Sequence, residues 1–229
     1  MGDPLFLLLL IGIPAISQFV STQLRKHFAQ FSRDPMPVSG REAAERMLYS
    51  YGIRDVRVIS TGGQLTDHYD PAKKTVNLSQ VVFDARNVAA VAVATHECGH
   101  ALQDASGYAL MSVRSSLIPL MRLSNVAIPL LVFGGAGVSQ LLGNHGTALL
   151  CLAGFGVPAL FSLVTLPVEF NASRRALKWL QESGMAEGNY RGARTALFWA
   201  AMTYVVGALG AIAQALYFVR LFLGRRRQS

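Results

Sequence analysis

Long apolar stretches dominate the pattern of this chain, and four of them are long enough to form membrane helices. Residues 4–24 supply about 21 mostly apolar positions, enough to cross a hydrocarbon core of about 30 Å. Residues 117–142 and 147–167 form two more spans, and the short connection 143–146 predicts that they pair as a helical hairpin. Residues 196–223 form the fourth span. The pattern therefore predicts an integral membrane protein.

The first span is predicted to be a membrane anchor rather than a secretory signal peptide. The chain begins Met1-Gly2-Asp3, which is acidic where a signal peptide is basic, and no small-residue cleavage site follows the apolar run. Short cytoplasmic loops collect Lys and Arg, and residues 25–114 contain eleven of them. We therefore expect these residues on the cytoplasmic side, together with the basic cluster at 174–194.

The last span is harder to place, because four simple crossings would leave the basic tail, residues 225–227, on the outer side. Gly207 and Gly210 interrupt this span. We expect it to bend back there or to pack partly against the cytoplasmic part. A full crossing with a basic outer tail is the alternative.

The only substantial polar segment lies between the first span and residue 96. Ser39, with Glu42 three positions later, has the pattern of a capping box and predicts an amphipathic helix that ends near Gly52. Three short runs of strand-forming residues follow, at 56–60, 65–69 and 75–78. The fold class is therefore predicted as α+β, mainly helical, with a short antiparallel sheet.

Two histidines four residues apart are the most informative feature of the chain. Positions i and i+4 of a helix lie on one face, so His96 and His100 can both reach one metal ion at about 2.0–2.1 Å. Glu97 stands between them and can accept a proton from a metal-bound water. This HExxH spacing is typical of zinc peptidases.

The surrounding residues argue against a chance histidine pair. Residues 87–95 are small and apolar, and Glu97 is the only charged residue between Arg86 and Asp104. A buried helix is predicted there, in which a carboxylate without a cationic partner would be costly. A metal ion would be that partner. A catalytic zinc site also needs a third protein ligand, and Glu169, at the end of an apolar span, is the candidate carboxylate.

These residues resemble those of a known family, the YugP-like bacterial membrane zinc metallopeptidases. The resemblance is carried by the segments 96–103, 67–71 and 169–176, and it runs over most of the chain. More distantly, the chain is similar to the HtpX-type and prenyl-protein-processing membrane proteases. The resemblance implies a zincin-like cytoplasmic catalytic domain, a zinc ion held by His96, His100 and Glu169, and Glu97 as the general base.

The chain departs from those distant relatives at one position. Their third ligand is followed four residues later by an aspartate, and Ser173 stands there in this sequence. Metal-binding histidines need a hydrogen-bond partner that orients the ring. We therefore expect Asn171 or Asp104 to take that role.

Two nearby features have both a catalytic and a plainer interpretation. Residues 74–79 can form an edge strand that pairs with the substrate backbone, or an ordinary sheet strand. His68 can donate a hydrogen bond to the tetrahedral oxyanion, or it can be a hydrogen-bonded turn residue, and Tyr69 has the same two interpretations. The sequence leaves these alternatives open.

The net charge and the two cysteines restrict which binding partners and covalent links are expected for this protein. The net charge of +8 fits attachment to an anionic lipid leaflet. No zinc finger, aromatic RNA-binding signature or basic repeat accompanies it, so nucleic-acid binding is not expected. Cys98 stands two positions from each histidine, which at about 100° per residue places it on the other side of the helix, and it is expected to pack rather than to bind metal. Neither Cys98 nor Cys151 suggests a disulfide framework.

The sequence therefore predicts a membrane zinc endopeptidase that cleaves membrane proteins or peptides from the cytoplasmic side of the cell membrane. Its expected parts are a transmembrane helix (1–24), the cytoplasmic part of the catalytic domain (25–116), a transmembrane hairpin (117–167), a third-ligand helix (168–195) and a C-terminal apolar helix with a basic tail (196–229). Two other classes stay open. One is a zinc-binding membrane scaffold without catalysis, and the other is a metal-ion transporter, which would place its ligands at mid-bilayer depth.

Overall fold

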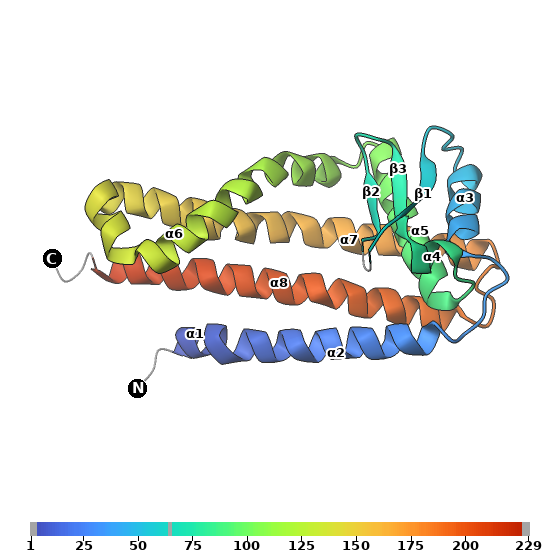
Figure 1. The fold of residues 1–229 in the computed structure, drawn as a ribbon, viewed down its shortest axis with the longest axis horizontal. Coiled ribbons are helices and arrows are strands. Elements are labelled where there is room, and N and C mark those ends of the chain that lie inside the picture. The colour runs from blue at the N-terminus through green and yellow to red at the C-terminus, as the bar shows by residue number, and fades with distance from the viewer. Residues whose placement is uncertain (1–3, 64–65, 226–229) are drawn as a thin grey trace. The chain divides into compact units, whose positions relative to one another are not determined.

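The computed structural model describes residues 4–63 and 66–225, and these are mainly helical with one small sheet (Figure 1). The helices are α1 (Pro4–Leu7), α2 (Ile13–Phe31), α3 (Gly40–Ser50), α4 (Gln80–Asp84), α5 (Val88–Ala105), α6 (Ala109–Cys151), α7 (Val157–Glu182) and α8 (Tyr190–Arg225), with π-helical turns η1 (Leu8–Gly12) and η2 (Leu152–Gly156). The strands are β1 (Arg57–Thr61), β2 (His68–Asp70) and β3 (Thr75–Ser79).

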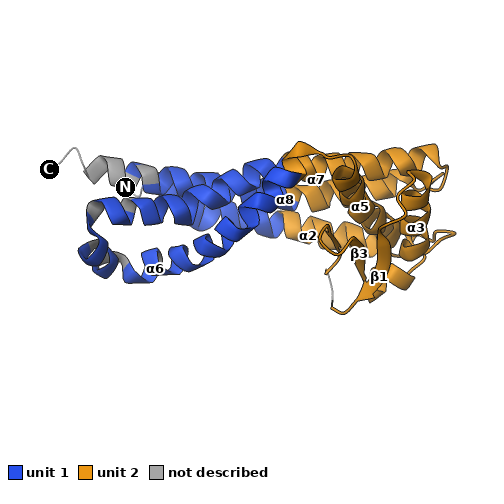
Figure 2. Ribbon diagram, turned by 90° about the horizontal axis from the view of Figure 1, so that it is seen from above, with its two compact units in different colours: residues 1–19, 112–166, 203–229 blue, residues 20–111, 167–202 orange. Residues whose placement is uncertain are grey.

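The chain divides into two compact units, which Figure 2 colours separately. The first contains Met1–Phe19, Ser112–Leu166 and Thr203–Ser229, and the second contains Val20–Met111 and Pro167–Met202. All the predicted site residues lie in the second unit.

Within the first unit, the segments before and after Gly143 lie side by side. The Ser124 hydroxyl donates a hydrogen bond to the carbonyl oxygen of Ala153, at 2.7 Å. A Cβ atom on Gly154 would lie 3.2 Å from the Leu131 side chain. Gly143 itself has φ of 63°, a left-handed conformation that favours glycine. The chain therefore folds back between these segments, and its crossing of a membrane as a hairpin stays a prediction.

Three helices among the described residues are long and apolar enough to cross a membrane: Pro4–Phe31, His145–Glu182 and Tyr190–Phe218. The predicted span 117–142 is not among them, and several of its side chains lie outside the described residues.

The expected bend of the last span is wrong. α8 runs through Gly207 and Gly210 as one helix. A glycine in a helix interior costs only about 1 kcal/mol, which is too little to break so long a helix. The first turns of α8 do pack against the second unit's core, where Ala193 and Leu197 are buried. Residues 226–227 of the basic tail lie outside the described residues.

The sheet of the second unit is mixed, not antiparallel as predicted. Its order is β1-β3-β2, with β1 parallel and β2 antiparallel to β3. A short turn after Asp70 allows β2 and β3 to pair as antiparallel neighbours. β1 pairs with the other edge of β3, in the parallel direction. The predicted strands 56–60 and 75–78 match β1 and β3 to within one residue, whereas β2 begins at His68, so the described residues Thr66 and Asp67 of the predicted strand 65–69 are not in a strand and Leu65 lies outside the described residues.

Of the two interpretations of residues 74–79, the edge strand is therefore wrong, and the ordinary sheet strand agrees with the structure. β3 is the central strand, so its backbone groups already pair on both sides. Beyond the end of β2, the Ser79 amide donates to Asp67 Oδ1 at 2.7 Å, which closes the remaining part of that side. The edges of the sheet are β1 and β2.

Helix caps fix the two helices that flank the sheet. Ser39 and Glu42 form the predicted capping box of α3, with each side chain accepting the other residue's backbone N–H. The Asn87 side chain caps α5 by accepting the Ala90 amide at 2.9 Å. α5 is buried along most of its length, as its apolar sequence predicted. α3 packs on it with Ala43, Ala44 and Met47 fully buried.

Candidate metal centre

Two histidines of α5 and one glutamate of α7 converge within the second unit. Nε2 of His96 lies 3.2 Å from Glu169 Oε2, and Nε2 of His100 lies 3.6 Å from the same oxygen. The two imidazole rings are 4.9 Å apart and nearly perpendicular, at 87°. The exposed fractions of the side chains are 14% for His96, 7% for His100 and 2% for Glu169. The three groups therefore meet in a place largely shielded from solvent.

These distances fit a tetrahedral zinc ion. Bonds of about 2.0–2.1 Å at tetrahedral angles hold the ligand atoms about 3.4 Å apart, close to the 3.2 and 3.6 Å between imidazole nitrogens and carboxylate oxygen. One ligand atom from each of the three residues can be chosen so that all lie within 4.8 Å of one another. Two imidazole nitrogens and one carboxylate are a donor set that zinc favours, and they leave a fourth position for solvent.

A glycine allows the two helices to approach so closely. If Gly99 carried a Cβ atom, that atom would lie 2.5 Å from the carbonyl oxygen of Ala172 on α7. No side chain fits at that distance, and the obstacle is rigid backbone. Because Ala172 is one turn beyond Glu169, the contact at Gly99 brings that carboxylate up to the two histidines.

Each histidine also has a hydrogen-bond partner for its other ring nitrogen. Nδ1 of His96 lies 3.0 Å from Ser173 Oγ, and Nδ1 of His100 lies 3.0 Å from Oε1 of the buried Gln103. Both histidines therefore turn Nε2 toward Glu169. Such partners fix the orientation of a metal-binding ring.

Comparison with known proteins bears on what this site is. A family model described as "Putative neutral zinc metallopeptidase" matches residues 6–223. The chain belongs to this family. It is also 36% identical over 228 residues to the "Putative membrane protease YugP" of Bacillus subtilis (strain 168), which covers 98% of this chain and 100% of that protein. No solved structure is significantly similar to the chain. The resemblance predicted from the sequence is thus confirmed, and zinc is the metal of this peptidase family.

The partners of the histidines differ from the prediction. Asp104 does not orient a histidine. Its Oδ2 accepts hydrogen bonds from the Tyr69 hydroxyl at 2.7 Å and from Lys74 Nζ at 2.6 Å, which turn it toward the sheet. Asn171 contacts Gln103 rather than a ring. Ser173, the residue that departs from the distant relatives, itself contacts His96.

Sequence reasoning missed Gln103 and Ser173, although their spacing was informative. Gln103 follows His100 by three residues and Ser173 follows Glu169 by four, so each shares a helix face with a predicted ligand. Either spacing can bring a polar side chain beside the metal-binding group.

The electrostatics of the site favour a cation. Burial acts against the charged form of His100, but its hydrogen bond to Glu169 and the nearby charge of Glu97 together raise its pKa. The same carboxylates would stabilise a metal cation in the proton's place. Glu97 is buried on α5 and makes no hydrogen bond or ion pair with another described residue.

A second charged cluster ties the sheet to the end of α5. Burial would raise the pKa of Asp104, but the hydrogen bonds from Lys74 and Tyr69 lower it. Burial and the same aspartate raise the pKa of Tyr69, and the bond to Asp104 raises that of Lys74. The cluster is therefore an ionised pair with a neutral phenol at neutral pH.

The remaining predicted residues lie apart from the three ligands. His68 is exposed on β2, and its Nδ1 lies 2.7 Å from the carbonyl oxygen of Thr66. Within the described part of the chain, no hydrogen bond or ion pair joins it to the metal centre. Cys98 is buried, with Sγ 3.6 Å from the Ala44 carbonyl oxygen, and burial raises the pKa of its thiol. It packs against α3 instead of pointing to the ligands.

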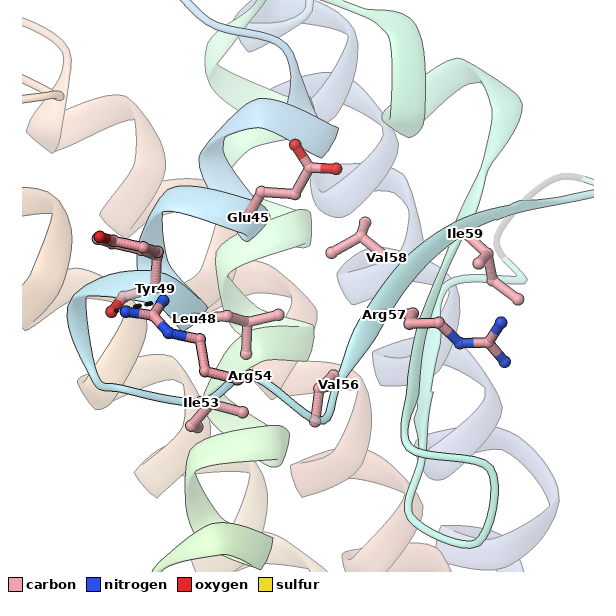
Figure 3. A pocket seen from close by; sticks show the side chains of 9 residues that line it. All are labelled: Glu45, Leu48, Tyr49, Ile53, Arg54, Val56, Arg57, Val58 and Ile59. Atoms are coloured by element: carbon pink, nitrogen blue, oxygen red, sulfur yellow. Dashed lines mark hydrogen bonds between the residues drawn. The ribbon is translucent and has the colours of Figure 1, made fainter.

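A separate pocket of about 400 Å³ lies between α3 and β1 (Figure 3). Apolar side chains such as Leu48, Val56 and Val58 line it, and the guanidinium of Arg54 stacks 3.6 Å from the ring centre of Tyr49 at its rim. None of the metal-centre residues lines this pocket.

Proposed function

We propose that the chain is a membrane zinc endopeptidase of the HExxH type, with a zincin-like catalytic domain and a glutamate third ligand. The observation that carries this proposal is the convergence of His96, His100 and Glu169 at the separations of a tetrahedral ion. Membership of a zinc metallopeptidase family supports it. Zinc, when bound, lowers the pKa of a coordinated water to about 7 and polarises the scissile carbonyl.

Glu97 is the proposed general base. It directly follows His96 on α5, is buried, and has no competing partner among the described residues. Its carboxylate accepts the proton of the attacking water and delivers it to the amine that leaves. Proton transfer by such a group contributes about 10²–10⁴-fold to the rate.

The sheet edge at β2 is the proposed site for the substrate backbone. β2 is an edge strand and contacts α5, which carries the histidines. An extended peptide can add to such an edge through main-chain hydrogen bonds, without requiring a particular sequence. His68 lies on this strand, exposed, and remains a candidate donor to the oxyanion.

The proposed substrates are membrane proteins or membrane-associated peptides, cleaved at the cytoplasmic face of the cell membrane. Three apolar helices of membrane-spanning length support a multi-pass protein, and the basic residues at 25–114 support the cytoplasmic side for the second unit.

The test compares the parent with Glu97→Gln and with Glu187→Gln, an exposed control on the connection between α7 and α8. Each protein is reconstituted in vesicles, its zinc is counted by elemental analysis, and cleavage of a fluorescently labelled unfolded protein is followed. We expect one zinc per chain in all three, and a loss of about 10²–10⁴-fold in cleavage only for Glu97→Gln. Parental cleavage by Glu97→Gln would exclude Glu97 as the base. A parent that binds zinc but cleaves nothing would indicate a scaffold.

A further inference from the structure

We propose that Gln103, Asn171 and Arg175 are positioning residues that fix which nitrogen of His100 faces the metal. The inference rests on the proposed zinc site. It concerns a chain of hydrogen bonds that runs within the second unit, from the guanidinium of Arg175 to the ring of His100. None of the three side chains belongs to the ligand set itself.

The links of this chain are short. Arg175 Nε donates to Asn171 Oδ1 at 2.9 Å, and Gln103 Nε2 donates to the same oxygen at 3.0 Å. Gln103 Nε2 also donates to the Val168 carbonyl oxygen at 2.7 Å. Gln103 Oε1 then lies 3.0 Å from His100 Nδ1. The Gln103 amide nitrogen therefore donates both of its hydrogen bonds, and the Gln103 side chain is fully buried.

The two ends of the chain determine its direction. A guanidinium only donates, so Asn171 must present its oxygen to Arg175. A backbone carbonyl only accepts, so Gln103 must present its nitrogen to Val168. These two orientations are compatible with each other, because the Gln103 nitrogen then donates a hydrogen bond to the Asn171 oxygen. Reversing either amide would place two acceptors or two donors face to face.

This direction fixes the state of His100. The amide oxygen of Gln103 can only accept a hydrogen bond. Nδ1 of His100 must therefore carry a proton and donate to that oxygen. The lone pair of the neutral ring is then on Nε2, the nitrogen that faces Glu169. A histidine must offer a lone pair to bind a metal. The chain therefore selects the ring form that can bind zinc and excludes the one that would turn an N–H toward it.

Arg175 anchors the chain at its half-exposed end. Its second contact is between a terminal guanidinium nitrogen and Ser106 Oγ, at 3.3 Å, which ties α7 to the end of α5. Without Arg175, the Asn171 amide is free to rotate. Only the hydrogen bond to the Val168 carbonyl oxygen then determines which way the Gln103 amide is oriented. We therefore expect a graded effect, largest at Gln103 and smaller at Arg175.

The experiment measures zinc affinity by competition with a chelating dye in Gln103→Met, Arg175→Met and Arg174→Met. Arg174→Met is the matched control, because it removes the same charge from the neighbouring, exposed position of α7. We expect zinc binding to weaken about 10–100-fold in Gln103→Met, severalfold in Arg175→Met, and not at all in Arg174→Met. Arg175→Lys, which still only donates, should recover most of the loss. Equal affinity in Arg174→Met and Arg175→Met would overturn the role of Arg175, even if Gln103→Met failed to fold.

The second measurement is nitrogen-15 NMR of labelled histidine in the zinc-loaded protein. We expect a slowly exchanging proton on Nδ1 of His100 in the parent, and a rapidly exchanging one in Gln103→Met. Coordination of zinc through Nδ1, with the proton on Nε2, would overturn the inference while leaving the zinc site intact. A parent that binds no zinc would instead overturn the proposed function together with this inference.

Discussion

The close contact between Gly99 of α5 and Ala172 of α7 can be tested by one substitution. Replacing Gly99 with Ala would place a Cβ atom 2.5 Å from the Ala172 carbonyl oxygen. An ordinary contact needs about 3.4 Å, so the helices must separate locally by about 0.9 Å. The obstacle is helix backbone, which cannot rotate away as a flexible side chain would.

Two measurable effects follow from this separation. Overpacking costs about 1–3 kcal/mol, and the better helix propensity of Ala returns about 1 kcal/mol, so the free energy of unfolding should fall by no more than about 2 kcal/mol. Ligand positions tolerate only about 0.2 Å, so Glu169 would no longer reach an ion held by both histidines. Zinc affinity should then fall by at least about 100-fold, more than for loss of an outer hydrogen-bond partner.

The assay for Gly99→Ala combines a thermal melt with zinc competition against a chelating dye. The matched control is Gly207→Ala, since a Cβ atom there meets nothing within 4 Å; it should keep parental zinc affinity. If Gly99→Ala bound zinc as tightly as the parent, the contact between the helices would not set the position of Glu169, and the reasoning would be refuted.

Two further predictions concern the neighbours of the site. Ser173→Ala removes the partner of His96 Nδ1 and should weaken zinc binding severalfold in the same dye competition, with little change in melting temperature; parental affinity would show that Ser173 is not needed to orient the ring. Asp104→Asn should lower the free energy of unfolding by about 1–2 kcal/mol at pH 7. Because the folded pKa of Asp104 is lowered, its contribution is complete above the ordinary carboxyl pKa of 3.8 and is lost as the pH falls through the lowered value. Denaturant titrations should therefore show the gap between parent and variant closing at acid pH, and a gap that stayed constant with pH would contradict this assignment.

Local signals in the sequence were enough for the helices that carry the site. The capping box of Ser39 and Glu42 and the apolar run before His96 depend on residues within one or two turns, and both formed as predicted. Glu169 was a candidate from its place at the end of an apolar span, but the full ligand set came from the family resemblance, because Glu169 stands 69 positions after His100 and no local pattern joins them.

Features that depend on long-range pairing were not predictable. Alternating residues identify a strand but not its neighbours, so the parallel pairing of β1 with β3 was missed. For the same reason the role of orienting a histidine was assigned to Asn171 or Asp104, two polar residues near the predicted ligands. In the folded chain, Tyr69 of β2 and Lys74, which directly precedes β3, donate hydrogen bonds to the Asp104 carboxylate, and the uncharged Gln103 contacts His100 instead.

The burial of Cys98 has a chemical consequence. A thiolate beside two histidines would compete for zinc and react with oxidants, but here the sulfur faces the backbone of Ala44 and burial keeps it protonated. Alkylating reagents should therefore modify it only in molecules whose α3 has opened away from α5. Cys98 is thus a native probe of that opening, and its labelling rate measures how often the helix that carries the histidines loses its cover.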